Sequence, residues 1–132
     1  MVLVWRLHLQ LATFLPFLSA FLPTASVGTA PFKVVEGGQF CQMTSDNCVT
    51  DGLGAHNDNE RCVIQVQRPG VLAIREFDVE SHNQCGWDSV AVGGIKYCVT
   101  AGPAGVGVSA QDTITWTSDF SITKSGWTIC LE

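Results

Sequence analysis

Six cysteines constrain the fold of this chain more than any other feature of its sequence. The chain has 132 residues, and the cysteines are Cys41, Cys48, Cys62, Cys85, Cys98 and Cys130. An even number of cysteines in a chain of this length is typical of a disulfide framework formed in an oxidising compartment. The gaps between them contain 6, 13, 22, 12 and 31 residues, and none has the short C-x₂-C spacing of zinc sites. We therefore expect three disulfides, for which the sequence alone permits fifteen pairings.

Residues 1–30 have the pattern of a secretory signal peptide. The single positive charge of Arg6 precedes an apolar run, Leu11–Leu22, and small residues follow it, which is the order found in cleaved signals. Ala25, Gly28 and Ala30 are the candidate cleavage positions. The alternative is an uncleaved membrane anchor, but Pro16 interrupts the run, Pro23 ends it, and it is shorter than the ~20 residues that a spanning helix needs. We expect a secreted, extracellular product with no membrane span after signal removal.

The rest of the chain has the length of one domain. We expect residues 31–40 to form an N-terminal arm and residues 41–132 to form the domain itself. Loss of Arg6 with the signal leaves six Lys and Arg against twelve Asp and Glu, a net charge of −6. This acidic balance argues against nucleic acid as a partner, since nucleic-acid binding depends on basic surfaces.

Short β-prone runs separated by turn residues predict an all-β domain with little helix. Val63–Gln67 and Val71–Phe77 alternate apolar and polar residues on either side of a Pro-Gly turn, which predicts a hairpin. The further runs are Ser89–Ile95, Val106–Ala110, Thr113–Thr117 and Gly126–Leu131. Many short strands at this spacing are typical of a sandwich or a barrel.

The sequence carries none of the common local signatures of hydrolases or nucleotide-binding proteins. Two histidines, His56 and His82, follow the signal, and both lie in polar, Asn-rich stretches where we expect solvated loop residues. Three carboxylates are more informative, because each stands at the end of a predicted strand: Glu80, Asp88 and Asp119. If these strand ends converge, the like charges need a hard cation such as Ca²⁺ to neutralise them. If they do not, each carboxylate caps a turn or faces solvent.

From Cys48 to Cys130 the sequence resembles a CUB domain, the extracellular β-sandwich module of complement proteases, procollagen-processing proteases and spermadhesins. The matching elements are NERCVIQV at 59–66, FDVE at 77–80, CGWDSV at 85–90 with Cys98 after it, and SDFS at 118–121 followed by SGW at 125–127. The resemblance implies an antiparallel jelly-roll-like β-sandwich. It also implies a binding module, not an enzyme.

In the calcium-binding branch of that family the resemblance implies Glu80, Asp88 and Asp119 as ligands of Ca²⁺, beside which a lysine or arginine of an extracellular protein partner binds. That branch usually supports the site with an N-terminal tyrosine. Here the only tyrosine, Tyr97, is elsewhere, and His56, in the corresponding stretch, is not an obvious substitute. The family pattern implies the disulfides Cys48–Cys62, Cys85–Cys98 and, for the remaining pair, Cys41–Cys130. Cys85–Cys98 is the firmest of these, and an exchange of partners between the other two pairs stays open.

Of the tryptophans, we expect two to be core residues and Trp87, next to Asp88, to be exposed where it can contact a ligand. An exposed tryptophan also suits the alternative function, a carbohydrate-binding, lectin-like β-sandwich. The sequence leaves open whether the chain stands alone or belongs to a longer protein.

Overall fold

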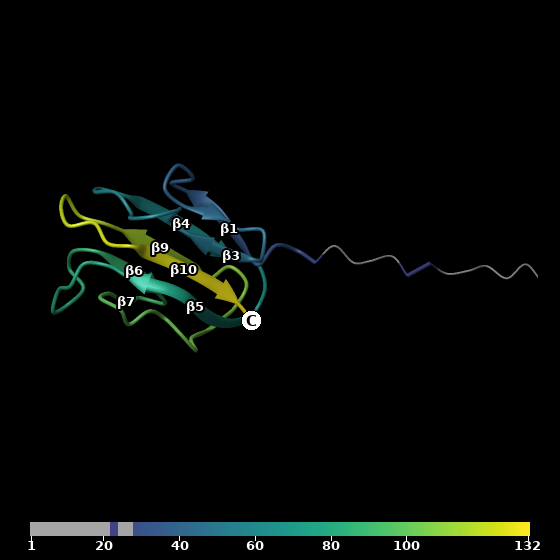
Figure 1. The fold of residues 1–132 in the computed structure, drawn as a ribbon. Coiled ribbons are helices and arrows are strands. Elements are labelled where there is room, and N and C mark those ends of the chain that lie inside the picture. Colours follow the sequence, from purple (N-terminus) through teal and green to yellow (C-terminus); the bar gives the residue numbers. More distant parts are fainter. Residues whose placement is uncertain (1–21, 24–27) are drawn as a thin grey trace, which may run out of the picture.

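A computed structural model describes residues 22–23 and 28–132 of the chain (Figure 1). The expected signal peptide, residues 1–30, therefore lies almost entirely outside the described residues. Within the described ranges, no helix is long and apolar enough to cross a membrane.

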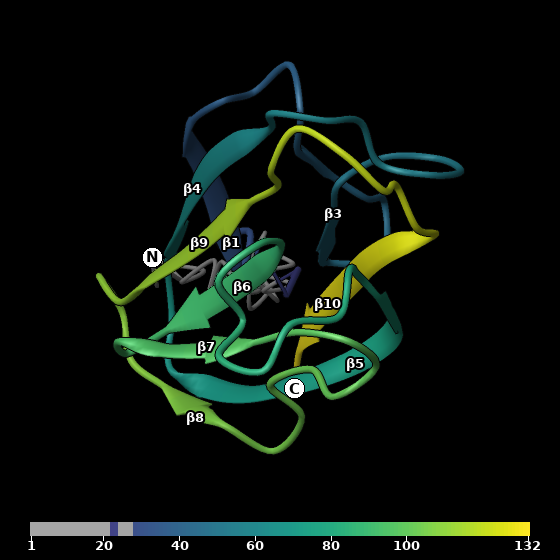
Figure 2. The same cartoon turned by 90° about the vertical axis from the view of Figure 1, so that its left-hand side faces the viewer.

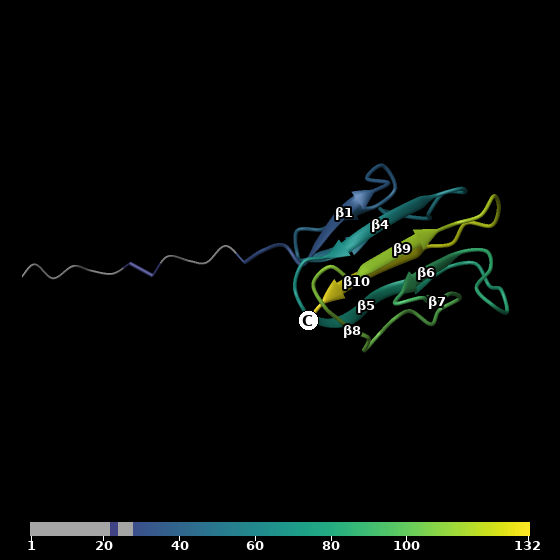
Figure 3. The ribbon, with the colours of Figure 1, turned by 180° about the vertical axis from the view of Figure 1, so that it is seen from behind.

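In the described part of the chain, ten strands form two five-stranded antiparallel sheets packed as a sandwich (Figures 1 and 3). The first sheet has the order β1-β4-β9-β6-β7, and the second has the order β2-β3-β10-β5-β8. The strands are β1 (Phe32–Glu36), β2 (Gln42–Met43), β3 (Cys48–Thr50), β4 (Arg61–Val66), β5 (Gly70–Asp78), β6 (Ser89–Val92), β7 (Ile95–Tyr97), β8 (Gly107–Val108), β9 (Thr113–Thr117) and β10 (Gly126–Leu131). The described residues contain no helix. The all-β sandwich expected from the sequence is confirmed.

Alternating side chains of the central strands form the core between the sheets. Trp116 of β9 and Trp127 of β10 are fully buried, and their rings meet edge to face with centroids 6.0 Å apart. Ile64 and Leu72 are buried beside them, one from each sheet. Because large aromatic side chains supply much of the apolar area that a small sandwich can bury, this tryptophan pair joins the two sheets. The expectation of two core tryptophans is confirmed.

The predicted hairpin between Val63–Gln67 and Val71–Phe77 is wrong. Both runs are strands, but β4 pairs with β1 and β9 in the first sheet, whereas β5 pairs with β10 and β8 in the second. The Pro-Gly connection crosses from one sheet to the other, so the apolar faces of the two strands meet across the core. Gly70 begins β5 so close to the end of β10 that a Cβ atom there would lie 2.5 Å from the Glu132 carbonyl oxygen.

The run Ser89–Ile95 is not one strand but a hairpin. Gly93 and Gly94 both have positive φ, 57° and 80°, which is the geometry of the tight turns that join antiparallel neighbours. They separate β6 from β7, and in this hairpin Val90 lies opposite Tyr97 and Val92 lies opposite Ile95. The run Val106–Ala110 contains only the two-residue strand β8.

The segment expected to be an N-terminal arm, residues 31–40, is part of the sandwich. Phe32–Glu36 form β1, which pairs antiparallel with β4, and Phe32 is buried in the core. The apolar residues Phe32 and Val34 alternate with polar and exposed neighbours, as expected for an edge strand with one face on the core.

The three disulfides are Cys41–Cys62, Cys48–Cys130 and Cys85–Cys98. The last is the pair that the resemblance implies, but Cys48–Cys62 and Cys41–Cys130 are wrong. The register of the second sheet explains the difference, because Cys48 of β3 lies directly opposite Cys130 of β10, with Cα atoms 4.0 Å apart. That leaves Cys41, just before β2 of the second sheet, to join Cys62 of β4 in the first, so this bond ties the two sheets together.

Candidate metal centre

Three loops meet at one end of the sandwich, opposite the C-terminus. They follow β3, β5 and β9, and they lie on the left in Figure 1 and face the viewer in Figure 2. The first sheet determines part of this arrangement, because Ser89 at the start of β6 pairs with Thr117 at the end of β9. Asp88 and Asp119, just beyond those residues, therefore come together. Glu80 arrives from the second sheet, two residues after β5 ends.

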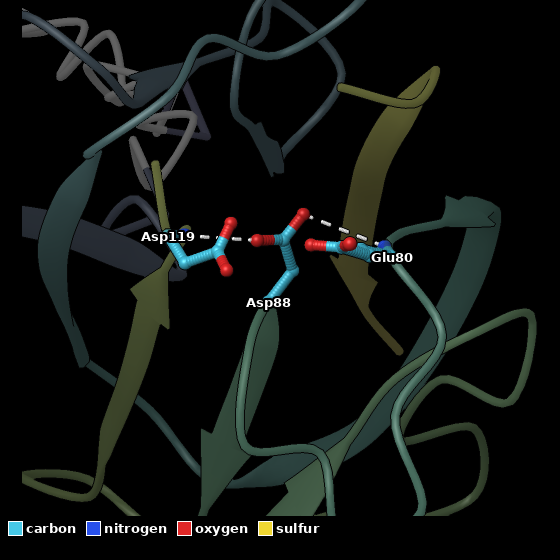
Figure 4. Close-up of side chains that lie close together, drawn as sticks. All are labelled: Glu80, Asp88 and Asp119. Carbon is cyan, nitrogen blue, oxygen red and sulfur yellow. Dashed lines mark hydrogen bonds between the residues drawn. The ribbon is translucent and has the colours of Figure 1, made fainter. Parts of the chain in front are cut away.

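The three carboxylates that the sequence singled out form one cluster. One oxygen from each of Glu80, Asp88 and Asp119 lies within 4.8 Å of the other two. Figure 4 shows the Asp88 carboxylate between the other two residues. Its Oδ1 accepts a hydrogen bond from Asp119 N at 2.9 Å, and its Oδ2 accepts one from Glu80 N at 3.4 Å. The site therefore spans both sheets and all three strand ends.

Burial makes this cluster electrostatically unfavourable without a cation. Asp88 is 0% exposed and Glu80 is 4% exposed. Burial raises the pKa of Glu80, and the charges of Asp119 and Asp88 raise it further. Burial also raises the pKa of Asp88, although the hydrogen bond from Asp119 and the nearby His56 act in the opposite direction. Like charges in a poorly solvated site favour the uptake of protons or of a metal ion.

Glu60 is a buried carboxylate outside the cluster, and both of its side-chain oxygens accept hydrogen bonds. Its Oε1 accepts hydrogen bonds from Asn57 N and Asn57 Nδ2, both at 3.0 Å, and its Oε2 accepts one from Trp116 Nε1 at 2.9 Å. Glu80 differs, since its Oε2 is buried and finds no hydrogen-bond partner among the described residues. Protein donors thus account for the burial of Glu60 but not for that of Glu80. A cation coordinated by oxygen ligands would account for it.

His56 is the functional residue that sequence reasoning missed. It was expected to be a solvated loop histidine, but its side chain is buried and its Nε2 lies 3.1 Å from Asp88 Oδ2. Its main-chain N donates to the Lys124 carbonyl oxygen at 3.1 Å, and Lys124 N donates to His56 Nε2 at 3.2 Å. Its ring also packs edge to face on Trp116, with centroids 5.1 Å apart. His56 therefore ties two of the three loops to each other and places its ring against Asp88.

The residues next to His56 in the sequence do not predict its burial beside Asp88. Its burial depends on a loop that is distant in the sequence, since its Nε2 accepts a hydrogen bond from the main-chain N of Lys124, 68 residues later. The polar residues around His56 correctly indicate a loop but do not reveal what covers it.

His82 organises the loop between Glu80 and Asp88. Its Nδ1 accepts hydrogen bonds from Gly86 N at 3.0 Å and Gln84 N at 3.3 Å, and its ring packs on that of Trp87 with centroids 4.5 Å apart. Trp87 is 45% exposed, as the sequence led us to expect. An exposed, partly immobilised aromatic ring therefore stands next to the most deeply buried carboxylate of the site.

The three carboxylates differ in their exposure to solvent. Asp119 is partly exposed, whereas Glu80 and Asp88 are buried. Asp119 Oδ1 accepts a hydrogen bond from Ser121 N at 3.0 Å, and its carbonyl oxygen accepts one from Asn59 N. The side chain is thereby held at the mouth of the cluster.

Comparison with known proteins adds one relative. No protein-family model matches the chain. The chain is 33% identical over 102 residues to Blastula protease 10 of Paracentrotus lividus, and the match covers 67% of this chain but only 17% of that protein. The chain therefore spans a small part of the relative's length. The all-β, disulfide-rich fold fits a CUB-like module, and its three disulfides are typical of extracellular proteins.

Proposed function

We propose that this chain is a secreted, CUB-like binding module that holds a calcium ion between Glu80, Asp88 and Asp119. The observation that carries the proposal is the buried, unpartnered Oε2 of Glu80 beside two further carboxylates. Oxygen ligands from carboxylates suit Ca²⁺ and Mg²⁺, and extracellular modules of this kind bind Ca²⁺ with dissociation constants of about 10⁻⁴ to 10⁻³ M. The ion would fix the three loops relative to one another.

The function that follows is recognition of a basic side chain on an extracellular protein. Three carboxylates and one divalent cation leave a net negative charge at the mouth of the site, and Asp119 is the carboxylate that a lysine or arginine can reach. The bound ion would set the geometry of Asp119, while Asp119 itself would make the contact. A charge-assisted hydrogen bond to an orientated carboxylate is stronger than a neutral one.

A titration of the oxidised domain with the peptide acetyl-Gly-Lys-Gly-amide, followed by ¹⁵N NMR, tests this function. In 2 mM Ca²⁺ the backbone signals around Asp119 should shift, and in EDTA the affinity should fall by at least about tenfold. Asp119→Asn should abolish the calcium-dependent binding. Asp58→Asn, an exposed acid on a neighbouring loop, is the matched control and should bind normally. Equal shifts with and without calcium would contradict the proposal.

The absence of catalysis is also part of the proposal. The lectin-like alternative draws its support from the exposed ring of Trp87. Under that alternative Trp87→Ala abolishes binding to a sugar array, whereas under the proposed function the same change only weakens the lysine contact.

A further inference from the structure

Large apolar side chains are exposed on the same loops that carry the acidic cluster. Phe120 is 76% exposed and Ile122 is 58% exposed, both in the loop after β9, and Trp87 is 45% exposed in the loop before β6. We call these three residues the apolar rim. Phe120 directly follows Asp119, and Trp87 directly precedes Asp88. The hydrogen bond from Asp119 N to Asp88 Oδ1 holds these two positions together.

Exposure of the apolar rim to water is energetically unfavourable. Exposed apolar side chains that gather around a polar centre mark interaction sites, whereas isolated ones are ordinary. Ile122 also has a φ of 57°, a left-handed conformation that is strained for a β-branched residue. The main chain thus carries strain at a residue whose side chain faces solvent and not the core. Strain of this kind concentrates at functional surfaces.

The negative charge of the domain favours one kind of partner for the apolar rim. The carboxylate cluster on the same loops is acidic, and the chain after Arg6 has a net charge of −6, so an anionic lipid surface is disfavoured and a cationic protein segment is favoured. We propose, building on the function above, that the partner presents a lysine or arginine flanked on both sides by large apolar residues. The basic side chain contacts Asp119, and its neighbours cover Phe120, Ile122 and Trp87.

Two short peptides separate this inference from the function on which it rests. Acetyl-Phe-Lys-Leu-amide and acetyl-Gly-Lys-Gly-amide carry the same charge and differ only in the apolar flanks. In 2 mM Ca²⁺ the first should bind the oxidised domain at least about tenfold more tightly, because its flanks bury apolar area. It alone should shift the emission of Trp87, the exposed tryptophan, towards the blue.

Variants of the rim supply the control. The double change Phe120→Ser and Ile122→Ser should reduce the affinity for the Phe-Lys-Leu peptide to that of the Gly-Lys-Gly peptide and leave the latter unchanged. Ile95→Ser removes an equally exposed apolar residue at the start of β7 and should change neither affinity. Because all three side chains point into solvent, these variants should fold.

Each remaining outcome is informative. Equal affinities for the two peptides would overturn the inference and leave the calcium-dependent lysine contact standing. No binding of either peptide in calcium would overturn both. Calcium-dependent co-sedimentation with phosphatidylcholine and phosphatidylserine vesicles, lost in the double variant, would show that a membrane and not a protein covers the rim, and would also overturn the inference.

Discussion

Removing the charge of Glu80 should stabilise the calcium-free domain. Its ligand oxygen lies within 4.8 Å of those of Asp88 and Asp119, and two unit charges at that separation repel by about 3.5 kcal/mol at an effective dielectric constant of about 20. Proton uptake relieves part of this repulsion, since burial and the two neighbours raise the pKa of Glu80. Glu80→Gln keeps the side-chain shape, and Oε2 has no hydrogen-bond partner to lose. We expect a gain of about 1 to 2 kcal/mol, or about 5 to 10 °C in Tm.

Thermal unfolding of the oxidised domain in EDTA at pH 7.5, followed by circular dichroism, measures this gain. Glu76→Gln makes the same change at an exposed position of β5 and should leave Tm within a degree or so of the wild type, as surface changes usually do. The raised pKa of Glu80 lowers the stability of the native domain only at pH values where the Glu80 carboxyl group ionises in the unfolded chain. The advantage of the Glu80→Gln variant over the wild type should therefore disappear below about pH 4, where both native and unfolded states are protonated. A lower Tm for Glu80→Gln in EDTA would refute the reasoning, because it would mean that the carboxylate is stabilised by the protein alone.

Three other results should follow from the structure. His56→Ala should weaken calcium binding about tenfold in a calorimetric titration, because residues that orient metal ligands typically contribute that much to the affinity. His56→Gln should recover part of the loss. Equal calcium affinities for the wild type and both variants would show that His56 does not support the site. Burial raises the pKa of Asp51 to about 6, so the contribution of Asp51 to stability should fall as pH rises from about 4 to 6. Asp51→Asn should remove that fall and gain about 1 kcal/mol of stability at pH 7.5, after allowance for the partial exposure of the side chain. A variant that is less stable than the wild type at pH 7.5 would contradict this. Non-reducing proteolysis and mass spectrometry should recover Cys48 linked to Cys130. Replacing both cysteines by alanine should lower the free energy of unfolding by about 4 to 5 kcal/mol, because the bond closes a loop of 82 residues. Recovery of Cys48 linked to Cys62 would contradict the strand register.

The carboxylate cluster could be predicted because its members stand at strand ends. Glu80, Asp88 and Asp119 each lie within two residues of β5, β6 or β9, so the positions of the strands nearly determine the positions of the acids. The exposed Trp87 and the two buried tryptophans follow from the same local pattern. What the sequence could not provide was burial, since the extent to which Glu80 lacks solvent depends on all three loops together.

Three of the wrong predictions share a physical cause, because each depended on contacts between distant parts of the chain. A Pro-Gly pair marks a turn between β4 and β5, but local chemistry does not say whether the chain stays in one sheet or crosses to the other. The disulfide partner of Cys48 was likewise decided by the pairing of β3 with β10, 82 residues away. His56 was misjudged for the same reason, because the loop that contacts it lies 68 residues later in the sequence.

Calcium-dependent thermal unfolding tests the central claim most directly. The oxidised domain is melted in EDTA and again in about 2 mM Ca²⁺, beside an Asp88→Ala variant. With a dissociation constant of about 10⁻⁴ to 10⁻³ M, binding should add about 0.6 to 1.8 kcal/mol, which is a rise of a few degrees for a domain of this size. The account predicts that rise for the wild type and none for the variant. The same melting temperature of the wild type in both buffers, or an equal rise in the variant, would contradict a calcium site at Glu80, Asp88 and Asp119.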